Sequence, residues 1–147
     1  MAGRGTAVSD HLPLTENIVF LVAKAHQRTQ GVLKGHLQPL GITPMQCLFM
    51  ESLCSEEGLS VGEIGRRIAL DTATLAGILD RLVNGGWVLR ESDPADGRVA
   101  RVYLTQKARE VIPQLCSAVN RTNDALLHGF SLEEKVLCKR FLRSIKE

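Results

Sequence analysis

The chain has 147 residues, of which 44% are hydrophobic and 23% are charged, and these values are typical of a single soluble globular domain. A chain of this length buries about two thirds of its unfolded surface, so it needs neither disulfides nor a metal to fold. The 18 basic and 16 acidic residues give a net charge of +2, which is too even to indicate nucleic-acid binding by itself. Composition therefore excludes a largely disordered chain and leaves the function open.

Several kinds of site find no support in the residue pattern. The longest uncharged run, residues 35–50, contains two prolines and is too short to span a membrane. The four cysteines form no CxxC pair and the four histidines no HxxxH spacing, so neither a metal nor another cofactor is expected. Cys47, Cys54 and Cys116 lie among apolar helical positions, which favours buried, reduced thiols and a cytoplasmic protein. Residues 1–11 are expected to form a loose tail.

The first part of the chain is predicted to be helical. Apolar residues recur at helical spacing over residues 15–37. Thr43 followed by Pro44 is a typical helix start, and a second helix is expected to follow it. Ser60 and Glu63 form a capping box that predicts a third, short helix ending near residue 70.

The next segment changes its period from helical to alternating. Either Asp71 or Thr72 is expected to cap a helix whose apolar residues follow the full helical template, and Gly85–Gly86 ends it. Residues 87–91 and 98–104 then predict two strands joined by a turn-rich segment.

Two more helices complete the expected fold. Thr105 is predicted to cap a long helix, and a second capping box at residues 131–134 opens a last helix that reaches Ile145. Two short helices joined by a tight turn and followed by a hairpin make a winged helix-turn-helix. The expected fold class is therefore mainly α with a small sheet (α+β), and a winged helix-turn-helix lies between the long terminal helices.

The helix after the tight turn is the candidate DNA-reading element. Its outward side chains are small or carry hydroxyls, and such a face can enter the major groove and contact phosphates or base edges. The alternative is an ordinary solvated face, but its first two turns lack the lysine and glutamate that are typical of one. Ser60, the cap of the preceding short helix, is added to this face as a candidate. The candidate DNA contacts are Ser60, Thr72, Ala73, Thr74, Gly77 and Arg81.

The hairpin adds two arginines to this interface. Arg98 lies at the tip, Asp96 is close enough in sequence to hold its guanidinium, and Arg101 follows. Arginine is the side chain that enters a narrow minor groove, although an arginine in a local surface ion pair would have the same sequence pattern. Residues 60–105 contain six arginines and six carboxylates, so DNA binding would depend on where the charges lie.

These segments resemble the MarR family, the multiple-antibiotic-resistance regulators. The wing of that family has an Asp-x-Arg signature followed by Leu-Thr at the next helix, as in residues 93–98 and 102–105. The residues around the second helix start, 42–46, and at the end of the DNA-reading helix, 79–83, are also similar, and the resemblance covers about residues 15–145. Family wings often carry two adjacent arginines, whereas this chain has Gly97 before Arg98, so a second minor-groove arginine would have to be Arg101.

The resemblance implies a homodimer that binds a palindromic double-stranded DNA operator. Residues 1–147 would form one MarR-like domain, in which residues 12–40 and 105–147 supply dimerisation helices and residues 43–105 the winged DNA-binding module. The apolar helices outside the module need a partner surface, and a two-fold dimer is the commonest way to provide it.

The resemblance also implies a small-molecule effector that binds between the dimer helices and the winged module and releases DNA. Apolar walls with a few polar groups are typical of such a site, and a cation with an imidazole would suit an aromatic acid or its coenzyme A thioester. An alternative is that the apolar members only form core. The candidate ligand-binding residues are Phe20, Lys24, Gln27, His36, Met45 and Phe49.

The favoured function is a ligand-released repressor, and two alternatives stay open. The first is a thiol-based redox repressor, although the family branch that senses organic hydroperoxides has a first-helix cysteine about where Val19 stands, and the thiols of this chain are Cys47, Cys54, Cys116 and Cys138. The second is a winged-helix protein-interaction module without DNA binding, which the zero net charge of residues 60–105 would suit. An enzyme is not expected, because no nucleophile–base pair or phosphate-binding glycine loop is present.

Overall fold

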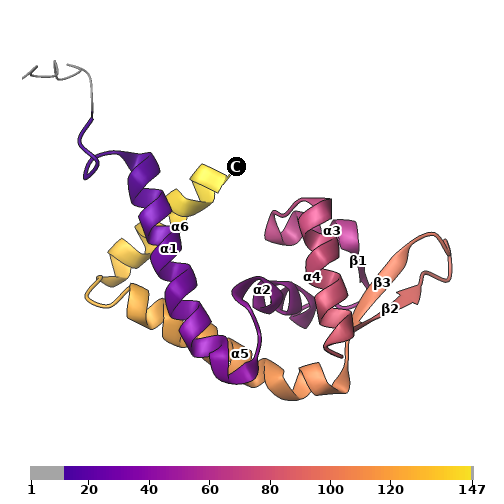
Figure 1. Cartoon of the computed structure of the whole chain (residues 1–147). Coiled ribbons are helices and arrows are strands. Elements are labelled where there is room, and N and C mark those ends of the chain that lie inside the picture. The colour runs from indigo at the N-terminus through magenta and orange to yellow at the C-terminus, as the bar shows by residue number, and fades with distance from the viewer. Residues whose placement is uncertain (1–11, 147) are drawn as a thin grey trace, which may run out of the picture.

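The computed structural model describes residues 12–146, so the expected tail at residues 1–11 lies outside the described residues. The arrangement is a winged helix-turn-helix flanked by long helices, as the sequence predicts (Figure 1). The elements are α1 (Ile18–Leu37), η1 (Gln38–Leu40), α2 (Pro44–Cys54), β1 (Leu59–Ser60), α3 (Val61–Ile68), α4 (Thr72–Asn84), β2 (Val88–Ser92), β3 (Ala100–Leu104), α5 (Gln106–Leu126) and α6 (Leu132–Lys146).

Side-chain caps set most helix starts. The predicted starts at Thr43, Ser60 and Asp71 are confirmed, because each of these side chains accepts a hydrogen bond from the backbone N–H three residues later. The first helix begins at Ile18, three residues later than expected. The carboxamide oxygen of Asn17 accepts from two backbone N–H groups there and caps the helix.

The sheet has three antiparallel strands in the order β1-β3-β2. The two predicted strands are present, shifted or shortened by one or two residues. Strand β1 was not predicted, because two residues are too few to show an alternating pattern. In the central strand, Arg101 is paired with Ser60 on one side and Glu91 on the other.

One hydrophobic core joins the winged module to α5. Helix α4 buries one face against it, and its other face is left to solvent. The largest fully buried side chains are Phe49, Leu37, Met50, Leu53, Ile64, Leu75, Leu82, Leu115, Val102 and Cys47.

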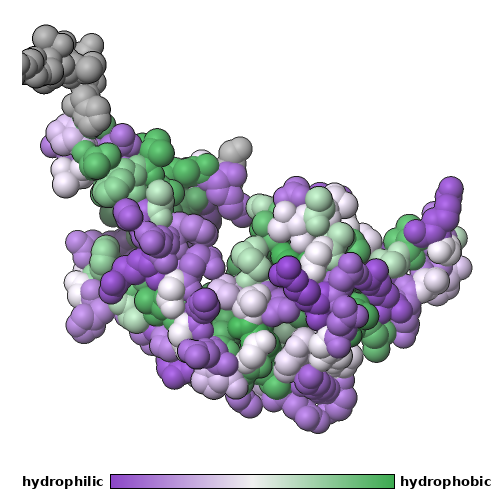
Figure 2. Space-filling view, in the orientation of Figure 1, coloured by the Kyte–Doolittle hydropathy of each residue, from purple (hydrophilic) through white to green (hydrophobic). Residues whose placement is uncertain are grey.

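The outer helices leave much apolar surface exposed within one chain. In α1 only Leu33 and Leu37 are buried, and α6 has no buried residue. Hydrophobic residues gather over the N-terminal half of α1 (Figure 2). The exposed large apolar residues of these two helices are Ile18, Val19, Leu21, Val22, Leu132, Val136, Leu137, Phe141, Leu142 and Ile145.

The four thiols are free but differ in burial. Cys47 is buried, and desolvation, followed by the nearby Glu51 carboxylate, raises the pKa of its thiol to about 12. Cys54 and Cys116 are exposed, so the expectation that all three lie in apolar, buried positions is wrong for these two. They occupy helix faces that α2 and α5 turn to solvent. Partial burial nevertheless raises the pKa of the Cys54 thiol.

The described part of the chain contains neither a membrane-spanning helix nor a metal-binding cluster. None of the helices between residues 12 and 146 has the length and apolar character to cross a bilayer. Over the same residues, no three His, Cys, Asp or Glu side chains come together as a set that could hold a metal ion.

Candidate nucleic-acid interface

A close contact between α3 and α4 fixes the angle between these two helices. Gly65 is buried where the two helices approach, and a Cβ at this position would lie 2.5 Å from Leu75 Cδ1 and 3.1 Å from the Leu70 carbonyl oxygen. The turn that follows is tight, since Ala69 has a left-handed backbone with φ of 54°. Only glycine permits this separation of the two helices.

The solvent face of α4 is the face that the sequence predicts. Its candidate contact residues, Thr72, Ala73, Thr74, Gly77 and Arg81, are all exposed. Asp71 organises the first turn, because its carboxylate accepts from Thr74 N at 2.9 Å and from Thr74 Oγ1 at 2.6 Å. These two bonds lower the pKa of Asp71, and the negative charge stays at the helix N-terminus, where the helix dipole favours it.

A groove runs between this face and the start of α2. It has a volume of about 500 Å³ and is lined by Thr43, Met45, Gln46, Ala73, Thr74, Gly77, Ile78 and Arg81. Thr43 and Gln46 form the capping box of α2. Their closeness to α4, a helix well separated from them in the chain, is a tertiary contact without a local signal.

The wing presents one arginine to solvent. The Arg98 side chain is 91% exposed, and Asp96 holds it with Oδ1 at 3.0 Å from Nε and Oδ2 at 3.2 Å from Nη2. The predicted Asp96–Arg98 pair is therefore confirmed. The hydrogen bonds from Arg98 hold the pKa of the Asp96 carboxyl below its usual value, so the pair stays charged at neutral pH.

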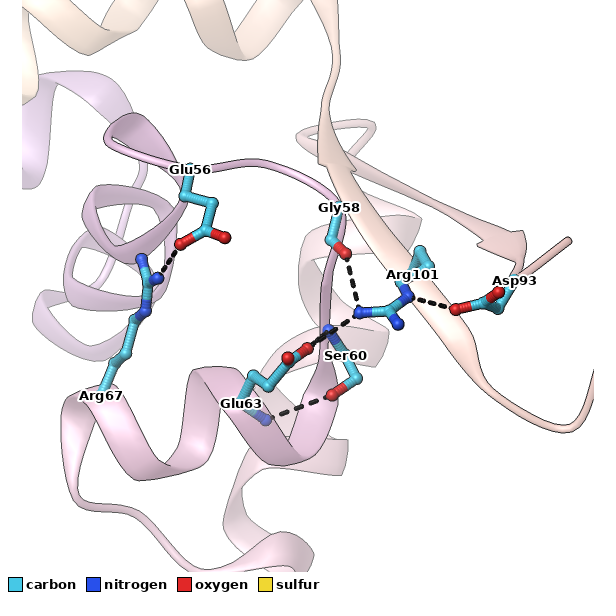
Figure 3. Close-up of polar contacts among 7 residues, drawn as sticks. All are labelled: Glu56, Gly58, Ser60, Glu63, Arg67, Asp93 and Arg101. Carbon is cyan, nitrogen blue, oxygen red and sulfur yellow. Dashed lines mark hydrogen bonds and ion pairs between the residues drawn. The ribbon is translucent and has the colours of Figure 1, made fainter. Parts of the chain in front are cut away.

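Arg101 is held by acceptors within the protein. Its side chain is 30% exposed, and Nε donates to Asp93 Oδ2 at 2.6 Å (Figure 3). Nη1 donates to Glu63 Oε2 at 2.9 Å and to the Gly58 carbonyl oxygen at 3.2 Å. A minor-groove contact by Arg101 therefore stays a prediction, and to make it the guanidinium would have to leave two carboxylates and a carbonyl that already hold it.

Ser60 is also engaged within the protein. Its hydroxyl accepts from Glu63 N at 3.3 Å, and its own N–H donates to Glu63 Oε2 at 2.7 Å. The hydrogen bonds with Ser60, followed by the charge of Arg101, lower the pKa of the Glu63 carboxyl.

The carboxylates of the winged module mostly clamp its arginines. Asp80 pairs with Arg90, in addition to the pairs of Arg98 and Arg101 with their acids. By contrast, Arg66 and Arg81 make no ion pair with any residue between 12 and 146, and both are exposed. The zero net charge of the module therefore hides an uneven distribution, in which free cations lie on α3 and α4.

The six predicted effector residues do not form one crevice in this chain. Phe49 is fully buried in the core, and Met45 lines the groove beside α4. Lys24 lies on the exposed half of α1, where its Nζ donates to Gln27 Oε1 at 3.1 Å and lies 5.7 Å from the ring centre of Phe20. Helical spacing correctly predicts that Phe20, Lys24 and Gln27 lie close together on α1. It cannot show that Met45, on α2, lines the groove beside α4 instead.

His36 lines a separate cavity of about 440 Å³ between the end of α1 and α5. Its Nδ1 lies 3.0 Å from Thr122 Oγ1, and the same hydroxyl donates to the Ala118 carbonyl oxygen at 2.8 Å. The Thr122 hydroxyl oxygen therefore accepts a hydrogen bond from His36 Nδ1–H. The other ring nitrogen, Nε2, takes no part in this bond. The cavity is lined by His36, Pro39, Leu40, Pro113, Gln114, Ser117 and Arg121.

Comparisons with known proteins agree with this architecture. A family model described as the MarR family matches residues 40–99, which include the whole of α3 and α4. The chain is 41% identical over 91 residues to the HTH-type transcriptional regulator TtmR of Methylorubrum extorquens (strain PA1). That region is 62% of this chain but 45% of the relative, so the chain matches about half of the relative's length.

Two solved structures share the fold over most of the chain. A single-residue mutant of MarR from E. coli, in complex with operator DNA, superposes with a TM-score of 0.82 and 25% identity, covering 92% of this chain and 99% of that one. Bordetella bronchiseptica BpsR, whose DNA binding is regulated by 6-hydroxynicotinic acid, has a TM-score of 0.87 and 22% identity, covering 93% and 98%. Together with the family model over residues 40–99, these findings show that the chain is similar to regulators of the MarR family in its helix-turn-helix and in its overall fold.

Proposed function

We propose that this protein is a sequence-specific double-stranded DNA-binding transcriptional regulator, a repressor that a small aromatic acid or acyl-coenzyme A ligand releases from its operator in the cytoplasm. DNA binding is supported by two surfaces of the winged module that occur together. Helix α4 exposes a face of small and hydroxyl side chains, and the wing presents Arg98 in a fixed orientation on Asp96. Such surfaces suit a helix that enters the major groove and an arginine that enters the adjacent minor groove.

The substitution Arg98→Ala tests the DNA contact. It should weaken operator binding by about 1–3 kcal/mol and reduce the slope of log affinity against log salt by about one. Fluorescence anisotropy with a labelled duplex selected by the wild-type protein from a random library measures both quantities. Arg28→Ala removes an exposed arginine from α1, outside the winged module, and should change neither.

Unchanged binding by Arg98→Ala, with circular dichroism showing an intact fold, would contradict the wing contact. A wild-type protein that selects no duplex, or binds DNA with a flat salt dependence, would instead favour the protein-interaction module.

The exposed apolar faces support a homodimer. Burying such surface is favourable by roughly 25 cal/mol per Å², and a monomer would leave both helices uncovered. The first half of α1 and the end of α6 form a hollow of about 570 Å³ lined by Ile18, Val19, Val22, Ala23, His26 and Ile145. In a two-fold dimer each copy covers this face of the other.

A dimer also sets the form of the operator. Two copies of α4 related by a two-fold axis should read half-sites about 10 base pairs apart in an imperfect palindrome. Footprinting that shows one asymmetric half-site would contradict this arrangement.

We place the effector in the cavity between α1 and α5. Arg121 lines it and makes no ion pair with another residue in the range 12–146, so its guanidinium can take a carboxylate. His36 Nε2 can accept a hydrogen bond from a ligand hydroxyl. Pro39, Leu40 and Pro113 supply apolar walls for a ring.

A gel-shift screen of aromatic acids and their coenzyme A thioesters, at fixed salt, tests this site. An effector must bind the DNA-free state more tightly than the bound state, and a 100-fold preference shifts the equilibrium by about 2.7 kcal/mol. Arg121→Ala should keep operator affinity and lose the response to the acid. If no acid weakens the complex while peroxide or a thiol oxidant does, the redox alternative is favoured.

A further inference from the structure

The guanidinium of Arg101 joins three segments that are distant in the sequence. It lies on the central strand β3 and bonds to Asp93 at the start of the wing loop, to Glu63 in the first turn of α3 and to the Gly58 carbonyl before β1 (Figure 3). No other charged side chain between residues 12 and 146 bridges the wing to α3 by an ion pair. The wing and the helix-turn-helix are therefore connected at this residue.

Each partner of Arg101 also organises its own segment. Glu63 Oε2 accepts from Ser60 N at 2.7 Å in addition to Arg101, so one oxygen serves both the cap of α3 and the bridge. Asp93 Oδ1 accepts from Ala95 N at 2.7 Å, while its Oδ2 holds Arg101. The Asp93 side chain is only 13% exposed. A shift of the guanidinium would disturb the wing loop and the α3 cap together.

We propose that Arg101 is a positioning residue for DNA binding, which locks the wing to the N-terminus of α3 and so sets the position of Arg98 relative to α4. The inference rests on the proposed function. A planar guanidinium with fixed donor directions suits this task, because it holds two acceptors at a defined angle. Arg101 contributes to affinity through Arg98 and makes no contact with DNA itself.

Neutralising the partner carboxylates separates this role from direct contact. Glu63→Gln and Asp93→Asn each remove a negative charge near the DNA-facing surface, so electrostatics alone would strengthen binding. If Arg101 positions the wing, each substitution should instead weaken binding about tenfold. Glutamine is accepted in capping boxes, so Glu63→Gln keeps the start of α3.

The control is Glu56→Gln, which removes a carboxylate that pairs with Arg67 on the same side of the module. It takes away the same charge without touching Arg101 (Figure 3) and should not weaken binding. The probe in all cases is the duplex that the wild-type protein selects from a random library, at constant salt. Binding by Glu63→Gln and Asp93→Asn that is unchanged or stronger would overturn the proposal.

A double-mutant cycle tests whether Arg101 acts through Arg98. Arg101→Gln should weaken operator binding nearly as much as Arg98→Ala, and the double variant should be no more than about twofold weaker than Arg98→Ala alone. Effects that multiply would show that Arg101 contacts DNA independently, and the proposal would fail.

Hydrogen exchange in the free protein gives a readout that needs no DNA. Arg101→Gln should speed amide exchange several-fold in residues 93–99, where Val99 N donates to the Asp96 carbonyl, and leave α5 unchanged. Unchanged exchange in the wing would overturn the locking role even if DNA binding falls. If the wild-type protein selects no duplex, the proposed function fails together with the DNA role of Arg101, and the exchange result then decides the lock by itself.

Discussion

The contact between α3 and α4 can be tested by adding one methyl group at Gly65. The new Cβ would lie 2.5 Å from a methyl of Leu75 and 3.1 Å from the Leu70 carbonyl oxygen. Leu75 is 1% exposed, so its side chain cannot rotate into solvent, and the carbonyl belongs to the tight turn. Gly65→Ala must therefore push the two helices apart.

The expected cost follows from two opposing effects. Overpacking a core costs about 1–3 kcal/mol, whereas alanine in place of glycine within a helix returns about 0.5–1 kcal/mol. The two ranges leave a net loss in the free energy of unfolding between about 0 and 2.5 kcal/mol, and roughly 1–2 kcal/mol is the middle of that interval. For a domain of about 150 residues this lowers Tm by about 2–8 °C.

Gly77→Ala is the matched control. Gly77 lies on the exposed face of α4, and a Cβ there would have no heavy atom within 4 Å, so the substitution should stabilise the protein by about 0.5–1 kcal/mol. Because that methyl stands on the proposed DNA-reading face, operator affinity should nevertheless fall.

Urea and thermal unfolding at one fixed protein concentration measure the stability difference, since the Tm of a dimer depends on concentration. A Gly65→Ala protein as stable as the wild type would refute the argument that this glycine sets the separation of the helices.

Three further predictions concern the wing, the dimer face and the thiols. Hydrogen bonds from Ala95 N–H and then Arg101 lower the pKa of Asp93, so the stability advantage of the wild type over Asp93→Asn should be constant from pH 7 to about pH 4 and shrink only as pH falls through the depressed pKa. A difference that already shrinks between about pH 7 and pH 5 would contradict this. Val136→Asp, on the exposed face of α6, should give a monomer in sedimentation at micromolar concentration, where the wild type should be a dimer. Cys47, with a pKa of about 12, should be the last thiol that iodoacetamide labels at about pH 8, as mass spectrometry can show, and labelling as fast as that of the exposed thiols would disprove it.

The sequence determined the elements and their order because the signals for them are local. A cap such as Thr43 or Ser60 bonds to a backbone group three residues away, and the apolar spacing of α4 depends only on the helical repeat. The Asp96–Arg98 pair was predictable for the same reason, since its members lie two residues apart.

The tertiary structure decided which side chains share a surface. The sequence pattern suggests that Arg101 is an unpaired arginine of the wing. In the structure it pairs with Glu63, which is 38 residues away in the chain. Phe49 and Met45 are four residues apart on α2, but one lies in the core and the other in the groove beside α4. Helical periodicity indicates which residues share one face of a helix. It does not indicate which part of the protein that face packs against. Burial and ion pairing depend on how distant segments pack, and that packing exists only once the chain has folded.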